Sequence, residues 1–251
     1  MKENEIIFQA INIKKEFDVT VALKGADITL KRGEIRGLIG ENGSGKSTIM
    51  SIAAGMQSAT SGEMVYKGKT WNPTSMIDAN LQGISMILQE ANTIPGITVA
   101  QNIFAGREKE FTSHGIVRIK KMIRAAQALL DKYEIGYIHA ADQIDRYNFE
   151  DRKLIELVRC INENIEILVV DETTTALSHN GRNVLYKLIH QLAEAHKTVV
   201  LISHDIDEIL EHCTSLTVLR DGEIMGELTK EDMQKSDIAN KIRYLMIGRE
   251  M

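Results

Sequence analysis

Residues 40–48 of this chain read GENGSGKST, directly after a short apolar run, EIRGLI. The pattern G-x-x-x-x-G-K-S places Gly40, Gly43 and Gly45 where the backbone can turn successive N–H groups toward a phosphate chain. The helical pattern that follows, at 46–55, would add the positive end of a helix to the same anion site. Strand, glycine loop and helix, in this order, therefore predict a binding site for a nucleoside triphosphate.

The residues of this loop and one later strand supply the groups that the chemistry needs. Lys46 is expected to neutralise the β- and γ-phosphates, and the Ser47 hydroxyl to ligate Mg²⁺. The apolar strand ILVVD, at 167–171, ends in Asp171, whose carboxylate can reach the same metal ion, and Glu172 is positioned to polarise an attacking water. The remaining loop residues assigned to the nucleotide site are Glu41, Asn42, Ser44 and Thr48.

Composition limits the class of protein. The chain has 251 residues, 43% of them hydrophobic, which suits one large α/β domain or a core domain with a smaller insertion. Its formal net charge is −5, with Lys and Arg spread along the chain, so a broad basic patch for nucleic acid is not expected. Cys160 and Cys213 match neither a zinc spacing nor a disulfide framework, and are expected to be reduced packing residues.

The N-terminus, MKENEIIFQA, lacks the apolar stretch of a signal peptide. No run approaches the roughly 18 apolar residues that span a bilayer. Any role at a membrane is therefore expected to act through a partner.

Hydrophobic periodicity predicts the order of the elements. Alternation at 5–13 and 26–30 is typical of half-buried strands. Continuous apolar runs that alternate with helical patterns favour a mostly parallel sheet covered on both faces, an α/β fold. The runs lie at 84–88, 167–171 and 198–203, and the helical patterns at 46–55, 116–133 and 152–161. The stretch from about 95 to 160 is expected to form a helical subdomain between the two parts of a catalytic core, 1–94 and 161–251.

Three motifs in this order, GENGSGKST, ILVVDE and LISHD, resemble those of the ATPase subunit of an ABC transporter, and the resemblance runs the length of the chain. It implies a P-loop NTPase of the ABC ATPase type, with an antiparallel β part near the N-terminus and a helical subdomain. It also implies that the chain binds ATP and Mg²⁺ and hydrolyses ATP.

The resemblance assigns further residues one at a time. Phe17 occupies the place of an aromatic that stacks on adenine. Gln89 resembles the glutamine that senses Mg²⁺ and water and faces the membrane partner. His204 corresponds to the switch histidine that contacts the γ-phosphate. TTALS, at 174–178, resembles the loop that crosses the subunit interface, and Thr173 replaces the proline that usually follows the acidic pair.

Three longer segments resemble the first ATPase half of bacterial simple-sugar importers of the ribose, galactose and xylose type: residues 81–108, SLTVLRDGE at 215–223 and LMIGREM at 245–251. This implies permease subunits in the membrane, a second ATPase subunit, an indirect role for a solute-binding protein, and a place on the cytoplasmic face of the cell membrane. Those importers usually carry two cassettes in one polypeptide of about twice this length, and this sequence stops where the second would begin.

One motif departs from the family. YNFED, at 147–151, stands where the signature LSGGQ is expected, and no glycine lies between Gly136 and Gly181. Asn148 replaces the serine and can still cap the following helix. Glu150 replaces the second glycine and brings a carboxylate and a side chain to a place that normally approaches phosphate. The degenerate signature therefore comprises Tyr147, Asn148, Phe149, Glu150 and Asp151.

Because a signature acts on the nucleotide of the other subunit, the defect predicts an asymmetric pair with a second, different ATPase. A homodimer that tolerates the unusual signature stays open, as does the identity of the solute. A soluble ABC ATPase acting on DNA or ribosomes would predict a coiled-coil insertion, zinc cysteines or a basic arm. An ATP-binding regulatory module with little turnover is the other alternative; the signature favours it slightly, and Glu172 argues against it.

Overall fold

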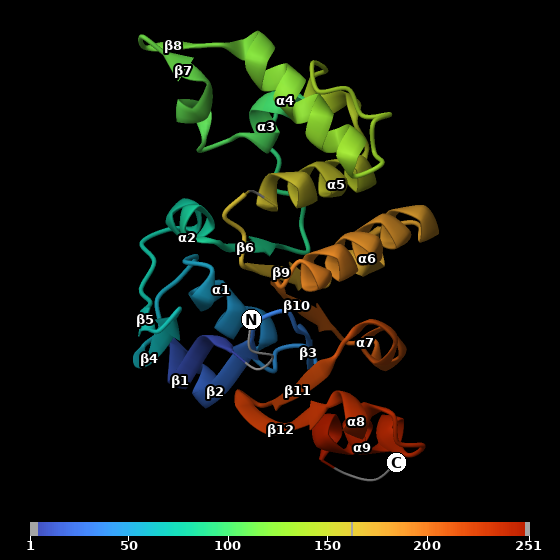
Figure 1. Cartoon of the computed structure of the whole chain (residues 1–251). Helices are drawn as coiled ribbons and strands as arrows, with labels where there is room; N and C mark the ends of the chain where they lie inside the picture. The colour runs from blue at the N-terminus through green and yellow to red at the C-terminus, as the bar shows by residue number, and fades with distance from the viewer. Residues whose placement is uncertain (1–4, 162, 249–251) are drawn as a thin grey trace. The chain divides into compact units, whose positions relative to one another are not determined.

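The computed structural model describes residues 5–161 and 163–248, which form two compact units (Figure 1). The first unit contains residues 5–86, 164–172 and 189–248, and the second contains residues 87–163 and 173–188. The expected helical subdomain, 95–160, lies within the second unit. The last three residues of the LMIGREM segment, 249–251, lie outside the described residues.

A sheet of six strands forms the centre of the first unit, in the order β12-β11-β3-β10-β9-β6. β3 pairs in parallel with β10 and β11, β10 pairs in parallel with β9, and the pairing of β11 with β12 is antiparallel. All residues of β3, β9 and β10 are buried, as expected for parallel strands covered on both faces. The strands are β3 Ile35–Ile39, β6 Ile84–Ile87, β9 Ile167–Asp171, β10 Thr198–Ser203, β11 Ser215–Arg220 and β12 Glu223–Thr229.

Four antiparallel strands make a second sheet, in the order β2-β1-β4-β5. The strands are β1 Ile6–Phe17, β2 Thr20–Lys31, β4 Ser61–Tyr66 and β5 Lys69–Thr70. β1 and β2 are longer than the alternating segments that predicted them, because their pairing continues through several bulges to the turn beyond Phe17. The predicted α/β fold with a mostly parallel sheet and an N-terminal antiparallel part is confirmed.

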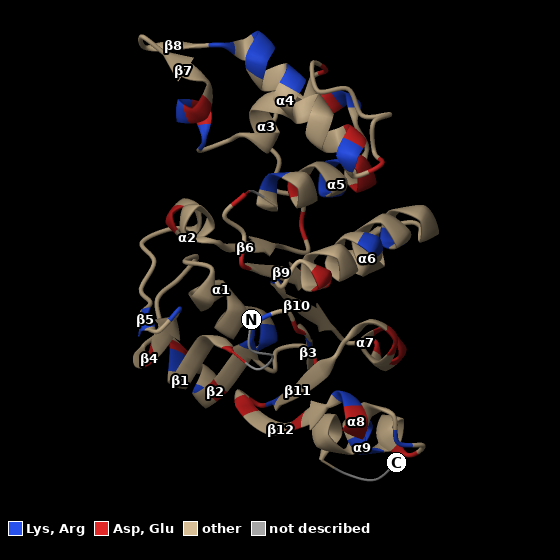
Figure 2. Ribbon diagram, in the orientation of Figure 1, with Lys and Arg blue, Asp and Glu red and all other residues tan. Residues whose placement is uncertain are grey.

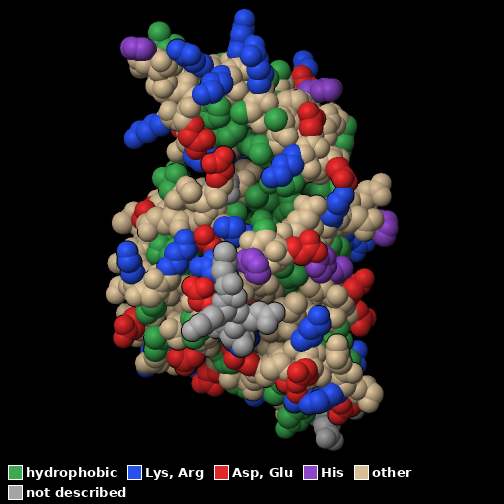
Figure 3. All heavy atoms as spheres, in the orientation of Figure 1, with side chains coloured by type: hydrophobic (Ala, Val, Ile, Leu, Met, Phe, Trp, Pro, Cys, Tyr) green, Lys and Arg blue, Asp and Glu red, His purple; other side chains and the backbone are tan. Residues whose placement is uncertain are grey.

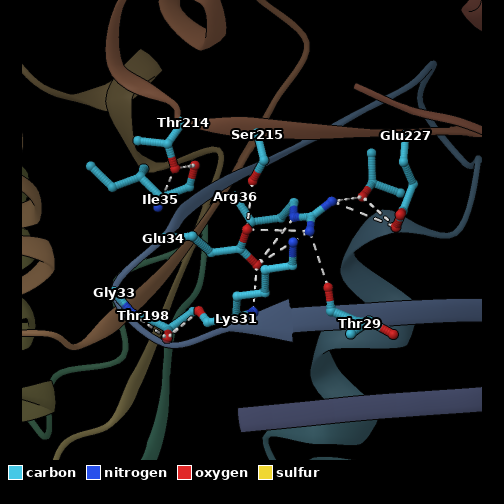
Figure 4. A network of polar contacts seen from close by, with 11 residues as sticks. Thr29, Lys31, Gly33, Glu34, Ile35, Arg36, Thr198, Thr214, Ser215 and Glu227 are labelled. Atoms are coloured by element: carbon cyan, nitrogen blue, oxygen red, sulfur yellow. Dashed lines mark hydrogen bonds and ion pairs between the residues drawn. The ribbon is translucent and has the colours of Figure 1, made fainter. Parts of the chain in front are cut away.

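A buried arginine joins the two sheets of the first unit (Figure 4). Arg36, on β3, donates to the carbonyl of Thr29 on β2 at 3.1 Å and to the hydroxyl of Thr217 on β11 at 3.2 Å. Its charge is balanced by Glu34, whose carboxylate lies 3.2 Å from the guanidinium and also accepts from Ser215 at 2.7 Å. A buried cation is tolerated when it is paired and hydrogen-bonded in this way.

Helices of the first unit pack on these sheets. α1 contacts β2, α7 contacts β3 and β10, and α9 contacts β11 and β12. The helices are α1 Lys46–Ala53, α2 Met76–Gln82, α7 Ile206–His212, α8 Lys230–Met233 and α9 Ile238–Ile247, and α6, His179–Glu194, runs from the second unit into the first. Among the described residues, no helix is long and apolar enough to cross a membrane.

The second unit is mostly helical, with α3 packed against α4 and α5. On the face shown in Figure 3, Lys and Arg side chains gather over the region of α4. The elements are α3 Val99–Ile103, α4 Ile119–Lys132 and α5 Phe149–Cys160, the short 3₁₀ turns η1 Glu108–Phe111, η2 Ile144–Arg146 and η3 Thr173–Ala176, and the strands β7 Thr112–Ser113 and β8 Ile116–Val117.

The helix predicted from residue 116 begins instead at Ile119. Ile116 and Val117 pair with Ser113 and Thr112 in a hairpin, so they are not available to the helix. The turn contains His114 and Gly115, both with positive φ. The helix predicted from the apolar periodicity of 116–133 therefore started too early in the sequence, because Ile116 belongs to the hairpin.

Candidate nucleotide-binding site

The glycine loop is held in place by contacts with β2 and with the turn between β11 and β12. The N–H of Gly222 donates to the carbonyl of Ser44, and the carbonyl of Gly222 accepts from the N–H of Lys24, each at 3.0 Å. Gly45 has φ +104°, and a Cβ built there would lie 2.7 Å from a methyl of Leu23. Only glycine fits this close approach without strain.

The loop leaves an anion site at the start of α1. Gly45 occupies the N-cap position, no side chain caps the helix, and its first turn contains no acidic residue. By contrast, α2 and α3 are capped by the hydroxyls of Ser75 and Thr98. A Cβ built on Gly43 meets nothing within 4 Å, so the loop is open on that side. Free helix N–H groups beside open space fit a phosphate chain.

Lys46 lies inside the loop rather than in solvent. Its ammonium donates to the carbonyls of Gly40 and Glu41 at 2.9 and 3.0 Å, and only 4% of its side chain is exposed. Burial lowers the pKa of Lys46, and the carboxylates of Glu172 and Asp171 partly offset this effect. A largely desolvated cation next to open N–H groups is suited to bind a polyanion.

Ser47 and Asp171 meet as the sequence predicted. The Ser47 hydroxyl donates to Oδ1 of Asp171 at 2.9 Å, although the two residues are 124 positions apart. The parallel sheet brings them together, because β9 ends beside β10, which itself pairs with β3. A serine hydroxyl and a carboxylate are hard oxygen ligands, and this pair fits Mg²⁺ that is also bound by phosphate.

Glu172 follows Asp171 with a backbone conformation unusual for a residue with a side chain, φ +42°. Its N–H donates to the carbonyl of Ile202 on β10 at 3.0 Å. Its carboxylate lies 3.9 Å from the Lys46 ammonium and 3.7 Å from Nδ1 of His204. Strained backbone of this kind is found at functional sites, and here it places a carboxylate between a cation and a histidine.

His204 and Phe17 are both accessible. The His204 side chain is 54% exposed and follows the end of β10. Phe17 ends β1, is 42% exposed, and has the Lys15 ammonium 4.8 Å from its ring centroid. An exposed aromatic ring at a hairpin end offers one face for stacking.

Gln89 belongs to the second unit, where it is exposed, and its backbone neighbours are held by α5. The buried Lys153 ammonium donates to the carbonyls of Leu88 and Glu90, on both sides of Gln89. Glu156 pairs with Lys153 at 2.9 Å and accepts from the N–H of Asn92. The segment 88–92 is therefore fixed on a helix face that carries both signs of charge (Figure 2).

Sequence reasoning missed this arrangement. Lys153, Glu156 and Arg159 follow a three-residue spacing, and Arg159 donates to the carbonyl of Asn92 at 2.8 Å. Charged residues at i, i+3 and i+6 share one face of a helix, and most of the residues between them are apolar. This spacing is the signal that could have identified a charged yet buried face.

The degenerate signature starts α5 and is tied to its own chain. Asn148 caps the helix, as predicted, by accepting from the N–H of Asp151 at 2.9 Å. Tyr147 accepts from the N–H of His139 at 2.7 Å, whereas Phe149 is 46% exposed. Glu150 accepts from the hydroxyl of Ser178 at 2.7 Å.

Comparison with known proteins identifies the family of this chain. The ABC transporter family model matches residues 23–175, more than half of the chain. The chain is 38% identical over 240 residues to the ribose import ATP-binding protein RbsA of Yersinia pestis, covering 96% of this chain and 46% of that protein. It is 31% identical over 247 residues to a putative ribose/galactose/methyl galactoside import ATP-binding protein of Geobacillus kaustophilus, covering 98% and 48%.

Solved structures share the fold. A nucleotide-free ATP-binding cassette from an ABC transporter superposes with a TM-score of 0.80 at 21% identity, covering 98% of this chain and 100% of that one. The dimeric ATP-binding cassette MJ0796 gives a TM-score of 0.77 at 24% identity, covering 89% and 99%. The chain belongs to the ABC transporter family, as an ATP-binding cassette. It spans about half the length of the curated relatives that it matches.

Proposed function

We propose that this chain is the ATP-binding and ATP-hydrolysing subunit of an ABC importer for simple sugars or related small polar solutes. The observation that carries the proposal is the meeting of Lys46, Ser47, Asp171 and Glu172 at one open glycine loop. The names of the relatives, all import ATP-binding proteins for ribose or similar sugars, supply the solute class.

Different residues of the site would bind the metal ion, the phosphate chain and the adenine. When bound, Mg²⁺ neutralises charge between the phosphates, and Ser47, Asp171 and Gln89 are the residues that would hold or sense it. The loop N–H groups and Lys46 bind and orient the phosphate chain. Phe17 offers its exposed ring to adenine.

Glu172 is the group that prepares the attacking water. A carboxylate at this place can accept a hydrogen bond from water, which orients the oxygen for in-line attack. His204, whose Nδ1 lies 3.7 Å from the Glu172 carboxylate, would contact the γ-phosphate. The Lys46 ammonium stabilises the negative charge that develops on the transferred group.

The signature is the part that this chain does not supply. Glu150 puts an acid where glycine N–H groups would approach phosphate, and like charges repel. We propose that the chain binds Mg·ATP competently and is paired with a second ATPase whose consensus signature completes its site. The pair would dock on permease subunits at the cytoplasmic face of the cell membrane and receive solute indirectly from a binding protein.

Affinity purification from gently solubilised native membranes tests the proposal. We expect this cassette with a permease and a second, signature-bearing ATPase cassette in equal amounts. A permease with copies of this cassette alone would refute the asymmetric pair. Recovery only from the soluble fraction, without a permease, would refute the importer itself.

A further inference from the structure

The N-terminus of α6 contains only half of a common helix cap. Ser178 precedes the helix, and its hydroxyl accepts from the N–H of Gly181 at 3.3 Å. In a capping box, the residue at this third position is Glu or Gln, whose side chain accepts from the backbone N–H of the residue that precedes the helix. Here the third position is glycine, so the sequence of α6 provides no such side chain.

An acid from another helix lies at the same place. Oε1 of Glu150, at the start of α5, accepts from the Ser178 hydroxyl at 2.7 Å. A Cβ built on Gly181 would overlap this same oxygen, although the backbone of Gly181 is not in the left-handed region. The carboxylate thus fills the space in which a side chain at position 181 would begin. A negative charge there also favours the positive end of a 16-residue helix.

We propose that Glu150 is the capping acid of α6: its carboxylate accepts from the Ser178 hydroxyl that caps the helix, and it lies where a side chain at position 181 would begin. The contact joins the degenerate signature, 147–151, to the loop 174–178 that precedes α6. Glu150 therefore does more than remove an anion site. The signature loses its contact with the nucleotide of the second ATPase, and Glu150 makes a contact with Ser178 of its own chain instead. This last step rests on the proposed function, whereas the cap itself does not.

A consequence is that the two substitutions that return serine and glycine to the signature also remove this contact. Asn148→Ser with Glu150→Gly removes the capping acid and leaves Ser178 and the start of α6 without it. Adding Gly181→Glu returns a carboxylate to the third position of the helix, where it can form the usual capping box.

Hydrogen exchange at the first turn of α6 tests the cap in the full chain. Glu150→Ala should speed exchange of the 179–183 amides by about tenfold, the loss of one charge-assisted hydrogen bond. Gly181→Glu alone should also speed exchange, since its side chain meets Glu150 and repels it. The two changes together should return exchange to the wild-type rate. Equal effects of Gly181→Glu in both backgrounds would overturn the proposal.

Asp151→Ala is the matched control. Asp151 is the neighbouring acid, but its carboxylate accepts from the hydroxyl of Tyr137 at 2.8 Å and not from Ser178. Its loss should leave α6 exchange unchanged, and faster α6 exchange in this variant would also count against a specific role of Glu150.

ATP turnover separates this inference from the proposed function. The triple variant Asn148→Ser/Glu150→Gly/Gly181→Glu should turn over several times faster than the double variant at saturating ATP, with little change in KM. If the double variant hydrolyses ATP, turnover no higher in the triple variant would overturn the link to the loop 174–178. If exchange behaves as expected and neither variant hydrolyses ATP, the cap stands and the proposed function fails.

Discussion

Replacing Lys153 by methionine removes one member of a buried ion pair and frees the loop that carries Gln89. The Lys153 and Glu156 side chains are 0% and 2% exposed and lie 2.9 Å apart. Truncating one partner of such a pair costs about 3–5 kcal/mol, because the other charge stays buried without compensation. Arg159, 3.4 Å from Glu156, retains part of that compensation, so we expect a loss of about 3 kcal/mol in the free energy of unfolding.

Urea denaturation followed by circular dichroism measures this loss. The control is Lys187→Met, which breaks a Lys–Glu pair with Glu134 in the same unit. Those side chains are 53% and 66% exposed, and an exposed pair contributes less than about 1 kcal/mol. A Lys153→Met/Glu156→Gln double variant should recover part of the stability, since glutamine removes the unpaired charge and keeps an acceptor for Asn92.

The single variant Lys153→Met should also loosen the segment 88–92. Its carbonyls at Leu88 and Glu90 lose their shared donor, so we expect faster amide exchange in that segment. Lys153→Met within about 1 kcal/mol of the wild type, with unchanged exchange at 88–92, would refute the reasoning.

Three further predictions concern single side chains. Phe17→Ala should weaken binding of Mg·ATP by about tenfold and Phe17→Tyr should not, as measured by titration calorimetry; equal affinities would remove Phe17 from the adenine site. In the Asn148→Ser/Glu150→Gly/Gly181→Glu background, Glu172→Gln should keep nucleotide binding and lower phosphate release by about a hundredfold or more, and unchanged release would exclude Glu172 as the group that prepares water. Burial raises the pKa of Cys160 to about 11 and also raises that of Cys213, so less thiolate forms than in free cysteine. Neither thiol should therefore react with a thiol reagent at mildly alkaline pH until the chain is denatured, and rapid labelling of the native chain would contradict this.

The sequence predicted the strands and the glycine loop of the candidate site because their signals are local or repeated. GENGSGKST encodes the turn, the helix start and the ligands within nine residues. The buried strands before Asp171 and His204 are continuous apolar runs, and parallel pairing brings their ends to one edge. The antiparallel strands and the Asn148 cap also follow from local patterns.

Contacts between distant residues carry no such local signal. Glu150 meets Ser178 across 28 positions, and Lys153 meets Leu88 across 65. From the sequence, Glu150 was described only by what it removes from the signature, because its partner Ser178, just before α6, could not be known. The hairpin at 112–117 was missed for a similar reason, since its short strands alternate too briefly to be distinguished from a helix start.

ATP turnover by the purified chain, with and without a restored signature, tests the central claim most directly. The account predicts that the wild-type chain binds Mg·ATP but hydrolyses almost none at any protein concentration. The Asn148→Ser/Glu150→Gly/Gly181→Glu variant should hydrolyse ATP at a specific rate that rises with protein concentration, because two copies then complete each other's sites. Turnover by the wild-type chain as fast as that of the variant, with the same concentration dependence, would contradict the account.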